Sequence, residues 1–128
     1  MKNMNEYDYE FKFIISLIIT IITETLTILF LYYIFRKRLK TPIKIDTILI
    51  SGIIPSLATL PYLWFILPLF IRAYLLFIVV GEISVVIIES IILFYLLKIK
   101  FLYSVVVSLI CNLCSFLLGV VLKNLVKL

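Results

Sequence analysis

Two acidic residues lie within a stretch of the sequence that is otherwise apolar enough to cross a lipid bilayer. They are Glu82 and Glu89, seven residues apart in the third apolar segment. In a helix this spacing returns both carboxyl groups to nearly the same face, roughly 10 Å apart along the axis. Ionisable residues inside a membrane are costly and usually face a bundle interior or a water-filled cavity. We therefore expect this segment to have a protein-facing side that other helices complete.

Two other apolar segments carry a polar residue near mid-depth. Glu24 lies in the first segment and Asn112 in the last. Each belongs to a stripe of hydroxyl residues with helical steps of three or four, which places the stripe on one face. We predict that Glu24, Glu82, Glu89 and Asn112 line the axis of a bundle at different depths. The supporting stripe residues are Thr20, Thr23, Thr27, Ser108 and Ser115.

These acids have no partner of opposite charge in the apolar segments, because every Lys and Arg lies outside them, and the chain has no histidine. In one interpretation the acids are neutral and hydrogen-bonded to hydroxyl and amide groups for packing. In another they carry protons or bind a hard cation such as Na⁺ or Mg²⁺ through oxygen. In a third they meet a basic residue of a partner protein. Without imidazole or a cysteine cluster, we predict no resident metal and no cofactor.

Cys111 and Cys114 have the C-x-x-C spacing of thiol oxidoreductases. Such enzymes need a second thiol pair for exchange, and this chain has two cysteines in total. Both lie at mid-depth in an apolar segment, where a reactive thiolate is poorly solvated. We favour two small packing residues and predict no enzymatic activity, with membrane thiol redox chemistry as a remote alternative.

The composition indicates an all-α integral membrane protein. Of the 128 residues 65% are hydrophobic, and the mean hydropathy is +1.28. Soluble domains are about half apolar. We predict a single transmembrane domain, a four-helix bundle preceded by a polar tail over residues 1–12. The expected helices cover about residues 13–35, 47–71, 73–97 and 101–122.

The second expected helix contains three prolines, which remove three backbone hydrogen bonds. They are Pro55, Pro61 and Pro68. We predict hinge positions at which this helix is kinked or broken. A kinked but continuous helix is common in membranes, whereas a broken helix with freed carbonyl groups is typical of transporter binding sites.

Basic residues gather on one side of the expected bundle. That side has seven (Arg36, Lys37, Arg38, Lys40, Lys44, Lys98 and Lys100), and the other side has five, diluted by three acids of the tail. The positive-inside rule then places both termini outside, in a prokaryotic cytoplasmic membrane, although a dual-topology protein would have a similar bias. The first five of these residues form a loop suited to contact with anionic lipids. Because the charges follow the segment ends, we expect no nucleic-acid partner.

In length, helix count and a mid-membrane Glu24, the chain resembles the small multidrug transporters. Their glycine-rich helix patterns are missing, and the acid pair of the third segment is additional. The four-helix fluoride channels have a similar length, but their glycine- and threonine-rich helix break is absent. These likenesses assign the chain to no family.

Two functions remain open from the sequence. The first is a subunit or accessory protein that docks on a larger membrane-protein partner through its polar stripes. The second is a small proton- or cation-coupled transporter or channel that works as a homo-oligomer, since four helices enclose little volume. The direction in which the acids point distinguishes the two.

Overall fold

The computed structural model describes residues 4–38 and 42–126, and only the backbone of residues 4–7, 123 and 126. Four helical segments are long and apolar enough to cross a membrane. The prediction of an all-α protein with four candidate membrane-spanning helices is confirmed, and the described residues include no β-strand. The elements are α1 (Met4–Phe35), the 3₁₀ turn η1 (Arg36–Arg38), α2 (Ile45–Pro61), η2 (Tyr62–Ile66), α3 (Leu67–Phe70), α4 (Tyr74–Leu97) and α5 (Phe101–Val126).

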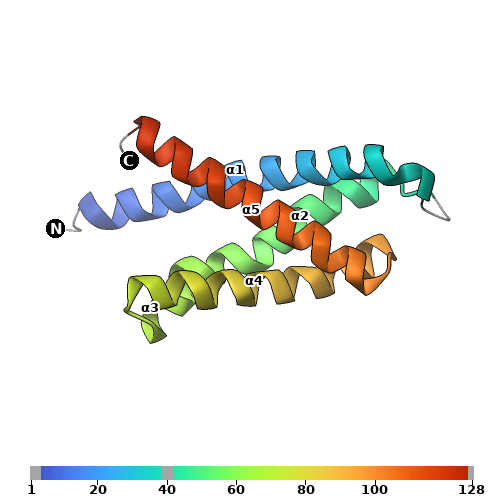
Figure 1. Ribbon diagram of the computed structural model, residues 1–128. Helices are drawn as coiled ribbons and strands as arrows, with labels where there is room; N and C mark the ends of the chain where they lie inside the picture. The colour runs from blue at the N-terminus through green and yellow to red at the C-terminus, as the bar shows by residue number, and fades with distance from the viewer. Residues whose placement is uncertain (1–3, 39–41, 127–128) are drawn as a thin grey trace.

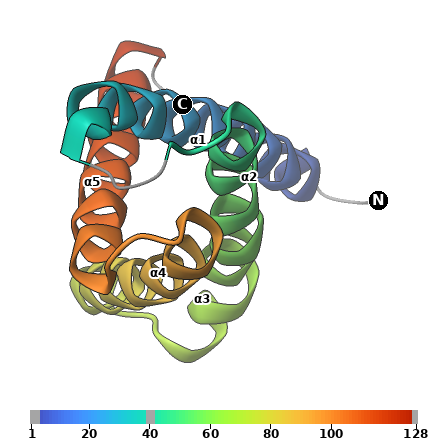
Figure 2. The ribbon, with the colours of Figure 1, turned by 90° about the vertical axis from the view of Figure 1, so that its right-hand side faces the viewer.

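The helices run up and down in a ring. Each long helix packs against two antiparallel neighbours, in the order α1, α2, α4, α5 and back to α1. Figure 2 shows this ring end-on, and Figure 1 shows that both termini lie at the same end. We call this the terminal end; the turn around Arg72 also lies there. The opposite, basic end carries η1 and the turn formed by Lys98 and Lys100.

The first helix extends beyond its apolar part. We expected it from about residue 13, but α1 begins at Met4, so the described part of the polar tail is helical. Residues 4–12 contain neither glycine nor proline, and Asp8 and Lys12 form an i,i+4 ion pair with 3.1 Å between oxygen and nitrogen. Such pairs support an exposed helix.

The proline-containing segment stays helical from Ile45 to Phe70. Directly after Pro61 the hydrogen bonding changes from α to π over η2, and α3 follows with Pro68 inside it. π-Helical stretches are often found at functional sites. Pro55 is buried within α2. The predicted kink stays a prediction.

The interior of the bundle is unusually polar and its surface apolar. Glu24, Glu89, Asn112 and several serine hydroxyls are buried, whereas large apolar side chains such as Phe30 and Leu113 are exposed along every long helix. In water this arrangement would leave apolar surface unburied, but in lipid the outer surface needs no further cover. Together with the four candidate membrane-spanning helices, this distribution suggests an integral membrane protein.

The apolar core lies in the basic half of the ring. Ile28, Ile48, Leu93, Leu97 and Cys111 form one buried cluster. Ile28 follows Glu24 by one helical turn toward the basic end, and Leu93 follows Glu89 in the same way. The buried carboxyl groups and the Asn112 amide lie toward the terminal half, whereas the buried polar side chains nearest the basic end are serines such as Ser51 and Ser104, whose hydroxyls bond to carbonyl groups one turn back. The bundle is therefore divided across its length into a dry half and a polar half.

Candidate functional site

A polar cavity of about 260 Å³ occupies the terminal half of the bundle. Its lining comes from residues 16–24 of α1, the end of α2 with η2, residues 82–89 of α4 and residues 112–120 of α5. Figure 1 shows that α5 leaves α4 toward this end and crosses to α1. All four predicted axial residues line this cavity: Glu24, Glu82, Glu89 and Asn112.

Glu89 is held by two neighbouring helices. Its side chain is only 2% exposed, although it carries a carboxyl group. Thr59 Oγ1 of α2 donates to Oε1 at 2.9 Å, and Asn112 Nδ2 of α5 donates to Oε2 at 2.7 Å. The Thr59 hydroxyl also lies 2.8 Å from the Pro55 carbonyl oxygen, so its one proton is shared between two acceptors, and Asn112 is the more secure donor to Glu89.

Glu24 is equally buried but only half satisfied. Ser56 Oγ of α2 donates to its Oε2 at 2.7 Å. No described residue provides a hydrogen bond for its Oε1, which is also shielded from the surface. An unpartnered buried oxygen is unfavourable. It is the position in this site that best suits a proton or a small cation.

The two acids share one face of α2. Ser56 and Thr59, which bind Glu24 and Glu89 respectively, are three residues apart, or about 4.5 Å along a helix axis. The carboxyl groups are thus neighbours in a low-dielectric interior, where two negative charges repel strongly. A proton on one member of the pair would relieve this repulsion.

Glu82 has a different environment from the other two acids. It lies on the same helix as Glu89, nearer the terminal end, and it is only half-buried in the cavity wall. Both acids of α4 line one cavity, as their spacing predicts, but only Glu89 is buried at the inner end, or floor, of the cavity, near the middle of the bundle. Glu82 stands between the floor and the terminal end.

The supporting stripe divides into two groups. Thr20 and Ser115 line the cavity, and the Ser115 hydroxyl is buried with no partner among the described residues. Thr23 and Thr27 instead donate to the carbonyl groups one turn back on α1, at 2.7 Å each. Such bonds are the ordinary behaviour of hydroxyl residues in helices.

On α5 a residue of the stripe, Ser108, orients the side-chain amide of Asn112. Ser108 donates to the Val86 carbonyl of α4 at 3.2 Å, and its own carbonyl accepts a bond of 2.8 Å from Asn112 Nδ2. Ser108 therefore fixes both the packing of α5 on α4 and the direction of the Asn112 side chain. That direction brings the amide to Glu89.

Sequence reasoning missed the contribution of the second helix. Ser56 and Thr59 make the direct bonds to the acids, yet only the prolines of this helix attracted attention. The available signal was a stripe of small and polar residues with helical spacing: Ser51, Gly52, Ser56 and Thr59. Gly52 allows α1 to come close, because a Cβ there would lie 1.9 Å from Thr25 Oγ1 and 2.8 Å from Thr25 Cα.

The cysteines point in different directions. Cys111 is buried in the apolar core, with its Sγ 3.9 Å from the Glu24 carbonyl oxygen, whereas Cys114 is exposed on the outer surface. The two sulfurs form no disulfide. On the next turn, Gly119 is exposed, and a Cβ there would meet no atom within 4 Å.

An aromatic cluster joins α1 to η2 beside the cavity, and one of its members, Trp64, belongs to the cavity lining. Tyr9 and Phe13 of α1 pack against Trp64 and Phe65 of η2, with ring centroids 4.9–5.8 Å apart. The Tyr9 hydroxyl donates to the Trp64 carbonyl. Pro68, one turn later, has no amide to offer that carbonyl, so the tyrosine takes over the role of the missing backbone donor.

The chain was also compared with known proteins. No family model, no curated protein and no solved structure matches it.

Proposed function

We propose that the protein is a small membrane transporter or channel that binds a proton, or another small monovalent cation, at the Glu24–Glu89 pair. The observation that supports this most is the geometry of the pair at the floor of a polar cavity. Glu89 has a hydrogen-bonding group beside each carboxyl oxygen, while Oε1 of Glu24 is buried without a partner among the described residues. A proton on that oxygen would remove the charge repulsion of the pair.

A proton suits this site better than a divalent cation. Mg²⁺ requires octahedral coordination and Ca²⁺ requires six to eight oxygens. In the described part of the chain, no three acidic or cysteine side chains lie close enough together to hold a metal ion. A proton needs only one oxygen and an acceptor, so the pair is sufficient.

In this proposal the cavity gives access from the terminal end, and the dry core of the basic half closes the path. With both termini outside, the site is loaded from the outside. Release to the other side requires a rearrangement of Ile28, Ile48 and Leu93, or a second copy of the chain that completes the path. Alternating access around a midplane site is how many secondary transporters work.

Proton flux in liposomes tests the proposal. Reconstituted Glu89→Gln and Glu24→Gln variants should fold but lose proton flux driven by a potassium diffusion potential, because glutamine keeps the shape and cannot exchange a proton. Glu10→Gln, which removes an exposed acid of α1, serves as the matched control and should keep the flux. Wild-type flux in the double variant at positions 24 and 89 would overturn the proposal.

A second candidate function rests on Glu82. Its half-buried carboxyl lies on the cavity wall, closer to the terminal end than the pair. A basic residue of a larger membrane partner that entered the cavity would reach Glu82 first, as expected for a subunit or accessory protein. In that case Glu82→Gln should release a co-purifying partner while the isolated bundle keeps its stability, and no variant should show flux.

A further inference from the structure

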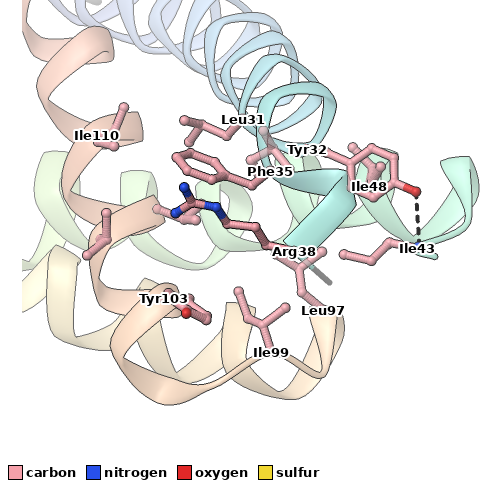
Figure 3. A pocket seen from close by; sticks show the side chains of 13 residues that line it. Leu31, Tyr32, Phe35, Arg38, Ile43, Ile48, Leu97, Ile99, Tyr103 and Ile110 are labelled. Carbon is pink, nitrogen blue, oxygen red and sulfur yellow. Dashed lines mark hydrogen bonds between the residues drawn. The ribbon is translucent and has the colours of Figure 1, made fainter. Parts of the chain in front are cut away.

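A second cavity, of about 290 Å³, lies in the basic half of the bundle. Figure 3 shows it between α1 and α5, with Leu31 and Phe35 on one side and Ile110 on the other. Ile28, Ile48 and Leu97, which belong to the apolar core, form part of its wall. The cavity is therefore a recess in the dry half, separate from the acids.

A cavity of this kind does not hold water well. Engineered cavities of about 150 Å³ lined by aliphatic and aromatic side chains stay dry and bind apolar guests. The present one is larger and lined almost entirely by such side chains. Left empty, its walls would lose dispersion contacts on one side. An alkyl chain would restore those contacts.

One charged side chain enters this apolar surrounding. Arg38 lines the cavity, and its guanidinium group extends beside Phe35 in Figure 3, with Cζ 5.8 Å from the ring centroid. No acidic residue is among the lining residues. A guanidinium group without a carboxylate is well suited to bind a phosphate, which it can contact through two parallel hydrogen bonds.

The position of the cavity matches the boundary between hydrocarbon and headgroups. Arg38 ends η1, directly after the apolar length of α1, and Tyr32 and Tyr103 also line the cavity. Tyrosines and arginines are typical of that boundary. The basic end has the larger share of Lys and Arg in the sequence, so it should face the leaflet that carries more anionic lipid.

We propose that this cavity binds one acyl chain of an anionic phospholipid, whose phosphate is held by Arg38. A second copy of the chain is a poorer occupant, because pairing two basic ends brings like charges together, which is costly. Such a site differs from general attraction between a basic loop and a lipid surface, because one recess holds the acyl chain and one arginine holds the phosphate. Of the other basic loop residues, Lys40 lies outside the described residues.

Native mass spectrometry of the full chain in detergent tests this site. Phosphatidylglycerol and phosphatidylcholine with identical acyl chains are the probes, and wild type should retain one phosphatidylglycerol in preference. Arg38→Gln should lower that preference about tenfold, the effect of losing one hydrogen bond between charged groups. Arg36→Gln is the matched control: this arginine lies over the Tyr33 ring, with Cζ 4.8 Å from its centroid, outside the cavity lining, and its loss should change the preference little.

Filling the cavity tests the acyl chain separately from the headgroup. Val107→Phe and Ile110→Phe add volume inside the recess and should abolish retention of the lipid, whereas Leu109→Phe on the exposed face of α5 should not. Two filling variants guard against one that fails to fold. Glycerol phosphate, which lacks acyl chains, should not compete. Equal retention of both lipids by wild type, an unchanged preference in Arg38→Gln, competition by glycerol phosphate, or a dimer that Val107→Phe dissociates would each overturn the proposal.

Discussion

The bundle contains two cavities of similar size and opposite chemistry. The cavity of the terminal half, about 260 Å³, has carboxyl, hydroxyl and amide groups among apolar lining side chains. That of the basic half, about 290 Å³, is lined by aliphatic and aromatic side chains around one arginine. The same four helices line both. The difference shows that the polarity of each half depends on where along each helix the polar stripe ends. On α1 the change occurs between Glu24 and Ile28, within a single turn.

The boundary between the halves coincides with a close approach of α1 and α2. Gly52 faces Thr25, which is adjacent to Glu24, and Gly52 precedes Ser56 by one turn. A close crossing at this level keeps the Ser56 hydroxyl within reach of the acid and closes the path toward the basic end. The largest expected effects therefore come from changes at the crossing.

We expect Gly52→Ala to destabilise the protein by about 3 kcal/mol, at the upper end for overpacking, because the new Cβ would overlap the backbone of α1 as well as a side chain. Unfolding in mixed micelles measures this. Gly119→Ala is the matched control, since a Cβ there meets nothing within 4 Å, and it should be neutral. Equal tolerance of both alanines would contradict the close crossing.

A smaller loss of stability is expected when a substitution leaves a void in the apolar core of the basic half. Leu93→Ala should cost about 2 kcal/mol, mostly from the void, because the transfer term largely disappears when the reference state is also in lipid. Leu93 is 2% exposed, whereas the control Leu113 is 59% exposed to the outside, and Leu113→Ala should cost little. The same unfolding measurement applies. A similar cost at both positions would mean that the basic half is not a packed core.

The orientation of the halves is tested by thiol labelling in intact cells. In a background with Cys111→Ala and Cys114→Ala, Ala73→Cys at the terminal end should react with an impermeant reagent. Pro42→Cys at the basic end should not. Both positions are exposed, and neither change alters the charge count. Equal labelling of the two would indicate dual topology rather than the orientation expected from the positive-inside rule.

Much of the fold could be predicted because hydropathy and charge set it locally. Neighbouring residues alone are enough to identify three features of the fold. These are the four apolar segments, the basic residues at their ends, and the helical stripes around Glu24 and Asn112. Glu24, Glu82, Glu89 and Asn112 all line one cavity, and their arrangement along the bundle axis stays a prediction.

What could not be predicted depends on how helices cross. Thr23 and Thr27 share the stripe of Glu24, but their hydroxyl groups are used by their own helix. Ser115 and Gly119 have the spacing of a packing motif, yet in this chain they line the cavity. Which stripe residues reach a partner is decided by the relative rotation of α1, α2 and α5, and a single sequence does not contain that rotation.

The smallest expected effect concerns the aromatic contact between α1 and η2 beside the polar cavity. Tyr9→Phe removes the hydroxyl that binds the Trp64 carbonyl but keeps the ring contacts, so it should cost about 1 kcal/mol or less. Trp64 is the only tryptophan of the chain and lines the cavity, so its fluorescence reports how accessible this part of the cavity is to water. We expect iodide to quench Trp64 more strongly in Tyr9→Phe than in wild type, because the loosened contact between α1 and η2 admits water. Tyr95→Phe, on an exposed tyrosine of α4, should leave the quenching unchanged. Identical quenching in all three proteins would show that the Tyr9 hydroxyl does not restrict the access of water to Trp64. The aromatic rings alone would then account for the shielding of Trp64.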